Sequence, residues 1–320
     1  MSGSLPRSAS GAQRDRGLAR GAREGRAFLD PAVVARLSHL DVRARFVVEG
    51  FISGMHRSPF HGFSVEFAEH RPYMQGDPLK NLDWKVWARS DRLLIKQYTE
   101  ETNLRCHLLM DLSGSMAFKS ERASMSKFDY AQALAAALAY LMLQQQDAVG
   151  AMLFAERLLK YLPARAVRSH LDELLKALGS AQPQGRTRLG PALHELAERI
   201  KRRGLIVLLS DLMDTPADVL LGLQHFRHRR HEVVVFHILD PDEVDFPYTD
   251  TATFVDLESG DRLTTEPWEI AKRYRERLSA WSARYAHVCR ENRIDYVRLD
   301  TRTPFDKALL AYLEKRSRLL

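Results

Sequence analysis

Short apolar runs alternate with helical patterns over most of the chain after residue 100. Each run has the length and content of a strand buried on both faces. The predicted strands are 104–110, 148–155 with a hairpin partner at 157–162, 205–210, 232–239 and 294–299. The predicted helices are 125–145, 168–178, 191–203, 216–229, 268–292 and 304–315. This alternation predicts an α/β fold with a doubly wound, mostly parallel sheet.

The helix predicted at 125–145 has a wide apolar stripe. Phe128, Ala131, Leu134, Ala135 and Leu138 recur at helical spacing, which is typical of a helix that lies on a sheet. The small alanines allow a close approach to that sheet.

Segments outside this alternation predict a second, smaller unit. Residues 31–40 and 41–54 have helical patterns, whereas 64–73, 93–100 and 253–264 alternate as strands do. We expect the three alternating segments to share one small β subdomain built from separated parts of the chain. The domain prediction is a tail at 1–28, helices and part of the β subdomain at 29–100, and the main domain at 101–320. Within the main domain, 241–267 is a hairpin insertion that joins the β subdomain.

The composition is that of a globular protein with a basic tail. The chain has 320 residues, 45% hydrophobic and 28% charged, with a net charge of +7. Six arginines face three acids in the first 30 residues, which predicts a disordered segment. The longest apolar run, 133–143, is shorter than the roughly 18 residues of a membrane span, so we expect a cytoplasmic protein. Cys106 and Cys289 are too few for a disulfide framework.

Candidate chemistry begins directly after the first predicted strand of the main domain. Asp111, Ser113 and Ser115 place one carboxylate and two hydroxyls in one loop at the carboxyl end of that strand. Hard oxygen donors are the ligands that Mg²⁺ or Mn²⁺ prefers over thiolate or imidazole. The alternative is a Ser/Gly turn in which Asp111 caps the following helix.

Two later positions extend this oxygen-rich set. Thr187 precedes the helix predicted at 191–203, and Asp211 follows the strand at 205–210. Separately, they are typical of a helix cap and a turn residue. Because parallel strands present their carboxyl ends at one edge, however, both side chains could converge there with those of the Asp111 loop.

The five positions resemble the metal-ion-dependent adhesion site of von Willebrand factor A domains, whose pattern is Asp-x-Ser-x-Ser, a distant Thr and a distant Asp. One position departs from many A domains, because Leu212 follows Asp211 where they have Gly. Upstream, the chain contains Gly76-Asp77-Pro78, Asp83-Trp84, Ala88-Arg89, Lys96 and Glu100. These motifs resemble those of the domain-of-unknown-function-58 family, which is found beside MoxR-type AAA+ ATPases.

This resemblance implies a non-enzymatic adaptor that binds protein through a bound metal ion. The implied metal ligands are Asp111, Ser113, Ser115, Thr187 and Asp211, and the implied partner is a MoxR-type AAA+ ATPase or its client protein. The sequence contains no P-loop, so any ATP hydrolysis would come from that partner.

Two other functions compete with the adaptor. A strand-end aspartate beside Mg²⁺ could act as a phosphohydrolase nucleophile, which would make Asp111 catalytic. Phosphatases of that layout place a second Asp two residues later, where this chain has Ser113. Nucleic-acid binding through the basic surface is the other alternative. We do not expect it, because acidic residues interleave with the basic ones.

Overall fold

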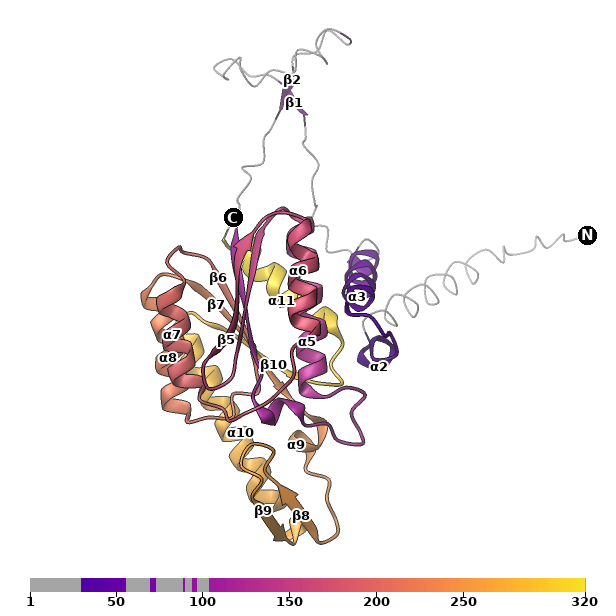
Figure 1. The fold of residues 1–320 in the computed structure, drawn as a ribbon, viewed down its shortest axis with the longest axis vertical. Helices are drawn as coiled ribbons and strands as arrows, with labels where there is room; N and C mark the ends of the chain where they lie inside the picture. Colours follow the sequence, from indigo (N-terminus) through magenta and orange to yellow (C-terminus); the bar gives the residue numbers. More distant parts are fainter. Residues whose placement is uncertain (1–29, 56–69, 73–88, 90–93, 97–103, 320) are drawn as a thin grey trace, which may run out of the picture.

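The computed structural model describes residues 30–55, 70–72, 89, 94–96 and 104–319. Its centre is a six-stranded sheet with helices on both faces (Figure 1). The order is β10-β7-β6-β3-β4-β5, and neighbours are parallel except for the β4–β5 pair. The strands are β3 (Arg105–Asp111), β4 (Ala148–Phe154), β5 (Leu158–Arg165), β6 (Leu205–Ser210), β7 (Glu232–Leu239) and β10 (Asp295–Asp300). The predicted mostly parallel α/β sheet is therefore confirmed.

The helices divide between the two faces of the sheet. On one face the core contains α5 (Lys127–Gln144), α6 (Ser169–Gly179) and α11 (Phe305–Ser317), and α3 (Leu40–Met55) packs on these helices from outside. The other packs against α7 (Leu189–Arg199), α8 (Pro216–His228) and α10 (Pro267–Glu291). Among the described residues, no helix is both long enough and apolar enough to cross a membrane.

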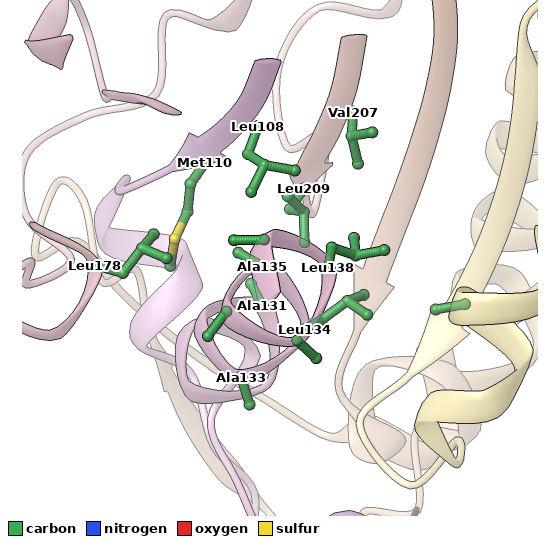
Figure 2. Close-up of a cluster of buried hydrophobic side chains, with 14 of the residues drawn as sticks. Leu108, Met110, Ala131, Ala133, Leu134, Ala135, Leu138, Leu178, Val207 and Leu209 are labelled. Atoms are coloured by element: carbon green, nitrogen blue, oxygen red, sulfur yellow. The ribbon is translucent and has the colours of Figure 1, made fainter. Parts of the chain in front are cut away.

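The central strands are apolar at most positions because both of their faces are covered. Leu108 and Met110 of β3 pack in the core beside α5, whereas Leu109 packs in the core beside α7 and α8. In Figure 2, Ala131 and Ala135 of α5 lie beneath the side chains of β3 and β6. The small side chains on this helix allow its backbone to approach the sheet closely.

The first residues of α5 explain where this helix begins. Ser126 is its N-cap, and the Ser126 hydroxyl accepts a hydrogen bond from the Asp129 backbone N–H. The helix ends at Gln144, and Gln146, two residues later, has a left-handed φ of 61°. The helix predicted at 125–145 is thus confirmed to within two residues at either end.

The helix predicted at 31–40 is shorter in the structure. The helix α2 (Pro31–Val34) ends after one turn, and α3 begins at Leu40. The Arg43 guanidinium donates hydrogen bonds to the carbonyls of Leu37 (2.7 Å) and Ala35 (3.4 Å) in the intervening segment. These bonds satisfy carbonyls that a continuous helix would have paired internally.

The prediction of one shared β subdomain is wrong for the described strands. Strand β1 (His70–Pro72) pairs with β2 (Leu94–Lys96), and β8 (Ala252–Val255) pairs with β9 (Arg262–Thr265), in two separate two-stranded sheets (Figure 1). The second hairpin is held by aromatic packing instead. Phe254 of β8 stacks on Phe246 and contacts the edge of Tyr248, and Phe246 in turn stacks on Tyr274 of α10. Those contacts attach the base of the hairpin to α10, without a third strand among the described residues.

Several sequence predictions lie outside the described residues. They are the tail at 1–28, the motifs Gly76-Asp77-Pro78 and Asp83-Trp84, Ala88, Glu100, and the outer parts of the strands predicted at 64–73 and 93–100.

The close contact between α5 and the sheet predicts that added volume destabilises the fold. Ala135 is fully buried, so Ala135→Leu should lower the free energy of unfolding by about 1–3 kcal/mol, measured by urea denaturation. Gln144→Leu on the exposed end of the same helix is the control, with a change within about 0.5 kcal/mol. Equal effects of the two substitutions would contradict this packing.

Candidate functional site

The candidate site lies at the carboxyl-terminal ends of β3 and β6. These two strands are adjacent and parallel. The chain leaves β3 for α5 on one face and leaves β6 for α8 on the other. Open α/β sheets bind their ligands at strand ends from which the loops diverge to opposite faces.

Asp111, the last residue of β3, lies buried at this point. Its Oδ1 accepts a hydrogen bond from the Ser113 backbone N–H (2.9 Å), and its Oδ2 accepts one from the Ser210 hydroxyl (2.6 Å). Burial, and then the charge of nearby Asp211, raises the pKa of Asp111 to about 7, although both hydrogen bonds oppose the shift. The carboxylate is thus held in place but short of positive charge.

The two serines follow within one tight turn. Ser113 precedes the 3-10 helix η2 (Gly114–Ala117), and its Oγ lies 3.1 Å from the Ser115 Oγ. Ser113 is buried and Ser115 is partly exposed, so the pair leads from the protein interior towards solvent. Their hydroxyls lie on the same side of the loop as a result.

Asp211 occupies the equivalent position after β6. Its Oδ1 accepts from the Met213 backbone N–H (3.2 Å). Leu212, where many A domains have Gly, adopts a left-handed φ of 56° and is fully buried. This backbone conformation is unfavourable for leucine, and burial of the side chain in the core offsets the cost. The loop therefore turns without glycine.

Lys127 is a functional candidate that sequence reasoning missed. Its side chain is only 1% exposed, and its Nζ lies 2.7 Å from Asp211 Oδ2 and 2.6 Å from Glu243 Oε1. Burial lowers the pKa of Lys127, but the two carboxylates raise it by more, so the ammonium stays charged. The signal in the sequence is that a lysine at the first position of a helix opposes the helix dipole. Such a position indicates an acidic partner elsewhere in the chain.

Glu243 comes from a helix that the sequence did not predict. The five-residue α9 (Pro241–Asp245) has a capping box formed by Asp240 and Glu243. The Asp240 carboxylate also accepts a hydrogen bond from the Ser120 backbone N–H (3.0 Å). Burial raises the pKa of Glu243, and the charge of Lys127 opposes that rise.

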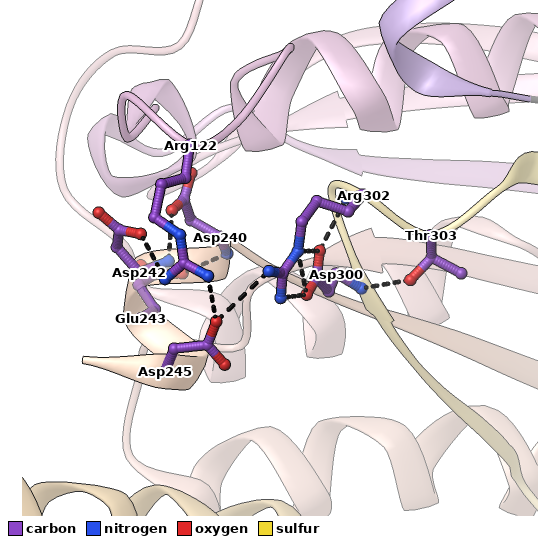
Figure 3. Close-up of polar contacts among 8 residues, drawn as sticks. All are labelled: Arg122, Asp240, Asp242, Glu243, Asp245, Asp300, Arg302 and Thr303. Atoms are coloured by element: carbon purple, nitrogen blue, oxygen red, sulfur yellow. Dashed lines mark hydrogen bonds and ion pairs between the residues drawn. The ribbon is translucent and has the colours of Figure 1, made fainter. Parts of the chain in front are cut away.

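An exposed ion-pair network joins three segments at the surface, namely the loop before α5, the helix α9 and the turn after β10 (Figure 3). Arg122 contacts Asp242 (3.3 Å) and Asp245 (2.6 Å), and Arg302 contacts Asp245 (3.3 Å) and Asp300. The two arginine side chains are more than 40% exposed, so each pair contributes little to stability. The network positions α9 rather than providing chemistry.

Thr187 reaches the site through pairing between two loops. Gln184 N donates to Leu112 O (2.7 Å), and Gly114 N donates to Gly185 O (2.9 Å). These bonds place the loop before α7 alongside the serine turn. The Thr187 hydroxyl does not cap α7, whose first residue is Leu189, and donates instead to Glu258 Oε1 at 2.5 Å.

Glu258 is the second residue that sequence reasoning missed. It lies in the turn between β8 and β9, and its carboxylate also accepts hydrogen bonds from the backbone N–H groups of Thr187 (2.8 Å) and Ser115 (3.4 Å). The hairpin pattern itself was visible in the sequence, but it does not indicate where the hairpin tip lies. Three distant segments therefore meet at Ser115 and Thr187.

The site is compatible with a hard cation. Its donors are oxygens only, and the mutual repulsion between Asp111 and Asp211 would be relieved by positive charge. Among the described residues, no three His, Cys, Asp or Glu side chains gather as a metal site, so a cation here would depend on the hydroxyls. Lys127 already supplies one positive charge next to Asp211, so the charge of Asp111 is the less compensated of the two.

Loss of the buried ammonium should be costly. Lys127→Met leaves Asp211 and Glu243 buried without their cation, and should lower the free energy of unfolding by about 3–5 kcal/mol in urea denaturation. Lys119→Met, an exposed position before the same helix, should change it by less than about 0.5 kcal/mol. The double variant Lys127→Met/Glu243→Gln should recover part of the loss. A single variant as stable as wild type would show that the pair is not formed.

The raised pKa of Asp111 predicts a pH-dependent penalty. Because the folded-state value of about 7 exceeds the ordinary value of about 4, the folded protein binds this proton more tightly than the unfolded chain does. Wild type should therefore lose stability relative to Asp111→Asn as the pH rises from about 4 to about 7. Urea denaturation in EDTA measures this difference, with exposed Asp172→Asn as control. A difference that is constant with pH would rule out the raised pKa.

Known proteins with similar sequences match most of the length of this chain. The chain is 30% identical over 234 residues to uncharacterized proteins of Mycobacterium bovis and Mycobacterium tuberculosis, covering 72% of this chain and 73% of each relative.

Among solved structures, one similar protein is the conserved hypothetical protein BatB from Bacteroides thetaiotaomicron. It has a TM-score of 0.45 and 18% identity, covering 67% of this chain and 99% of that one. An aerotolerance-related membrane protein from Bacteroides fragilis has a TM-score of 0.45 and 19% identity, covering 66% and 99%.

The family model described as "Protein of unknown function DUF58" matches residues 69–286, which is more than half of the chain. The chain therefore belongs to the DUF58 family.

Proposed function

We propose that this protein is a non-enzymatic, metal-dependent protein-binding adaptor with a von Willebrand factor A-like domain. Its adhesion site consists of Asp111, Ser113, Ser115, Thr187 and Asp211. The observation that carries this proposal is the meeting of three loops at the diverging ends of β3 and β6, where carboxylate and hydroxyl oxygens gather. Such a set suits a cation that binds an acidic partner better than it suits a nucleophile.

The residues of the site have distinct roles in this proposal. Asp111 supplies the principal negative charge, and Ser210 and the Ser113 N–H orient its two oxygens. Ser113, Ser115 and Thr187 supply neutral oxygens. Lys127 holds Asp211 in place and neutralises part of its charge. When bound, Mg²⁺ or Mn²⁺ would supply positive charge and a free position for an incoming carboxylate.

The proposed partner is a MoxR-type AAA+ ATPase or a client protein presented to it. Support comes from the resemblance of the five-position motif and of the upstream motifs to those of MoxR-associated proteins. The adaptor would contribute recognition, and the ATPase would contribute nucleotide hydrolysis. The protein would act in the cytoplasm, without a membrane or nucleic-acid partner.

The hydrolase alternative is weaker for a geometric reason. Both carboxylate oxygens of Asp111 accept hydrogen bonds, from Ser113 N and Ser210 Oγ. A carboxylate stabilised in this way is a poorer nucleophile than a free one. The observation favours a structural ligand over an attacking group.

Asp111→Ala and Thr187→Ala should each abolish metal-dependent partner binding, because each removes an oxygen ligand of the proposed ion at the carboxyl-terminal edge of the sheet. Both variants should remain folded, and Thr187→Ala should change the free energy of unfolding little. Calorimetry against the purified ATPase in constant Mg²⁺ measures binding and leaves the ATPase's own nucleotide site intact. The matched controls are the exposed residues Asp172→Ala and Thr251→Ala, which should bind as wild type does.

Two results would redirect this proposal. Wild-type affinity in Asp111→Ala would remove the adhesion-site mechanism, and salt-sensitive binding to DNA retained in that variant would favour nucleic-acid recognition. Turnover of phosphate esters by wild type that is lost in Asp111→Ala would instead establish a hydrolase.

A further inference from the structure

The carboxylate of Glu258 lies within the candidate site although it comes from the β8–β9 hairpin. Its Oε1 is 2.5 Å from Thr187 Oγ1 and 3.4 Å from Ser115 N, and its Oε2 is 2.8 Å from Thr187 N. These are the two site residues nearest to solvent, since Asp111 and Ser113 are buried. An acidic side chain from outside the site would have to approach the same two residues.

The hairpin turn is built to present this side chain. Asp256 Oδ1 accepts hydrogen bonds from the backbone N–H groups of Glu258 (2.7 Å) and Ser259 (3.3 Å). Gly260 takes a positive φ of 77°, which closes the turn and returns the chain to β9. Local hydrogen bonds therefore fix the backbone from which Glu258 projects.

The hairpin also packs directly on the serine turn. A Cβ added to Gly114 would lie 2.9 Å from Leu257 O, 3.1 Å from Gly185 O and 3.4 Å from the Glu258 Cγ. Only glycine allows this approach without displacement of the hairpin or of the loop before Thr187. The contact is therefore a close-packed interface rather than a chance approach of one long side chain.

We infer that Glu258 is an intrachain carboxylate ligand of the proposed adhesion site, occupying the position that an acidic side chain of a partner takes. This inference rests on the proposed function and adds a residue and a form of regulation to it. The hairpin holds its carboxylate at the site at an effective concentration of about millimolar or higher, as tethered ligands do. A partner's acidic side chain must displace the Glu258 carboxylate, so competition with the hairpin lowers the apparent affinity for the partner.

The test is a Mn²⁺ titration of the purified full chain by calorimetry. Wild type is compared with Glu258→Gln, with Asp111→Ala, and with Glu266→Gln as the matched control. Glu266 is an exposed glutamate next to β9, and the structure gives it no contact with the site. Amide hydrogen exchange of residues 252–265, with and without Mn²⁺, reports whether the ion holds the hairpin.

A carboxylate ligand contributes charge that an amide does not, and ligand charge is a main determinant of affinity for hard cations. Glu258→Gln should therefore bind Mn²⁺ at least about tenfold more weakly, whereas Glu266→Gln should stay within about twofold of wild type. Mn²⁺ should slow amide exchange of the hairpin in wild type and leave it unchanged in Glu258→Gln.

The outcomes separate this inference from the proposed function. If Asp111→Ala loses Mn²⁺ binding but Glu258→Gln matches wild type, the intrachain ligand is wrong and the adhesion site stands. Protection of the hairpin by Mn²⁺ in Glu258→Gln, equal to that in wild type, would also overturn the inference. A wild-type protein that binds no Mn²⁺ at millimolar concentration overturns both.

Discussion

Buried negative charge at the carboxyl-terminal edge of the sheet is the constraint on which the site depends. Asp111, Asp211 and Glu243 lie close together there, and removing carboxylates from water costs several kcal/mol unless cations or hydrogen bonds compensate. Lys127 compensates Asp211 and Glu243 directly. Among the described residues, Asp111 is compensated by the hydrogen bonds of Ser113 and Ser210. Asp111 is therefore the least compensated of the three carboxylates.

The topology of the sheet makes this arrangement possible. The chain leaves β3 and β6 towards opposite faces, so the loops after both strands meet at the strand ends. The paired loops at Leu112–Gln184 and Gly114–Gly185 then form one wall. The insertion between β7 and α10 contributes both α9, which brings Glu243, and the hairpin, which brings Glu258. One insertion thus places the Glu243 carboxylate on Lys127 and the Glu258 carboxylate on Thr187.

Much of the fold could be predicted because it follows from local patterns. Strands buried on both faces are apolar at most positions, and α5 has an apolar stripe, so the order of strands and helices could be predicted from the sequence. The β subdomain was predicted wrongly because alternation identifies a strand but not its partner. Aromatic contacts with Phe246 and Tyr274, far from the hairpin tip, decided where that strand pair lies.

The sequence by itself determined the strands and longer helices of the main domain and the oxygen-rich loop at Asp111, since these depend on residues within one or two turns of each other. Only the tertiary structure decided which polar side chains come into contact. Lys127 and Asp211 are 84 positions apart, Ser210 and Asp111 are 99 apart, and Thr187 and Glu258 are 71 apart. No local periodicity records such pairs, because each depends on how the sheet orders its strands and where the insertion folds back.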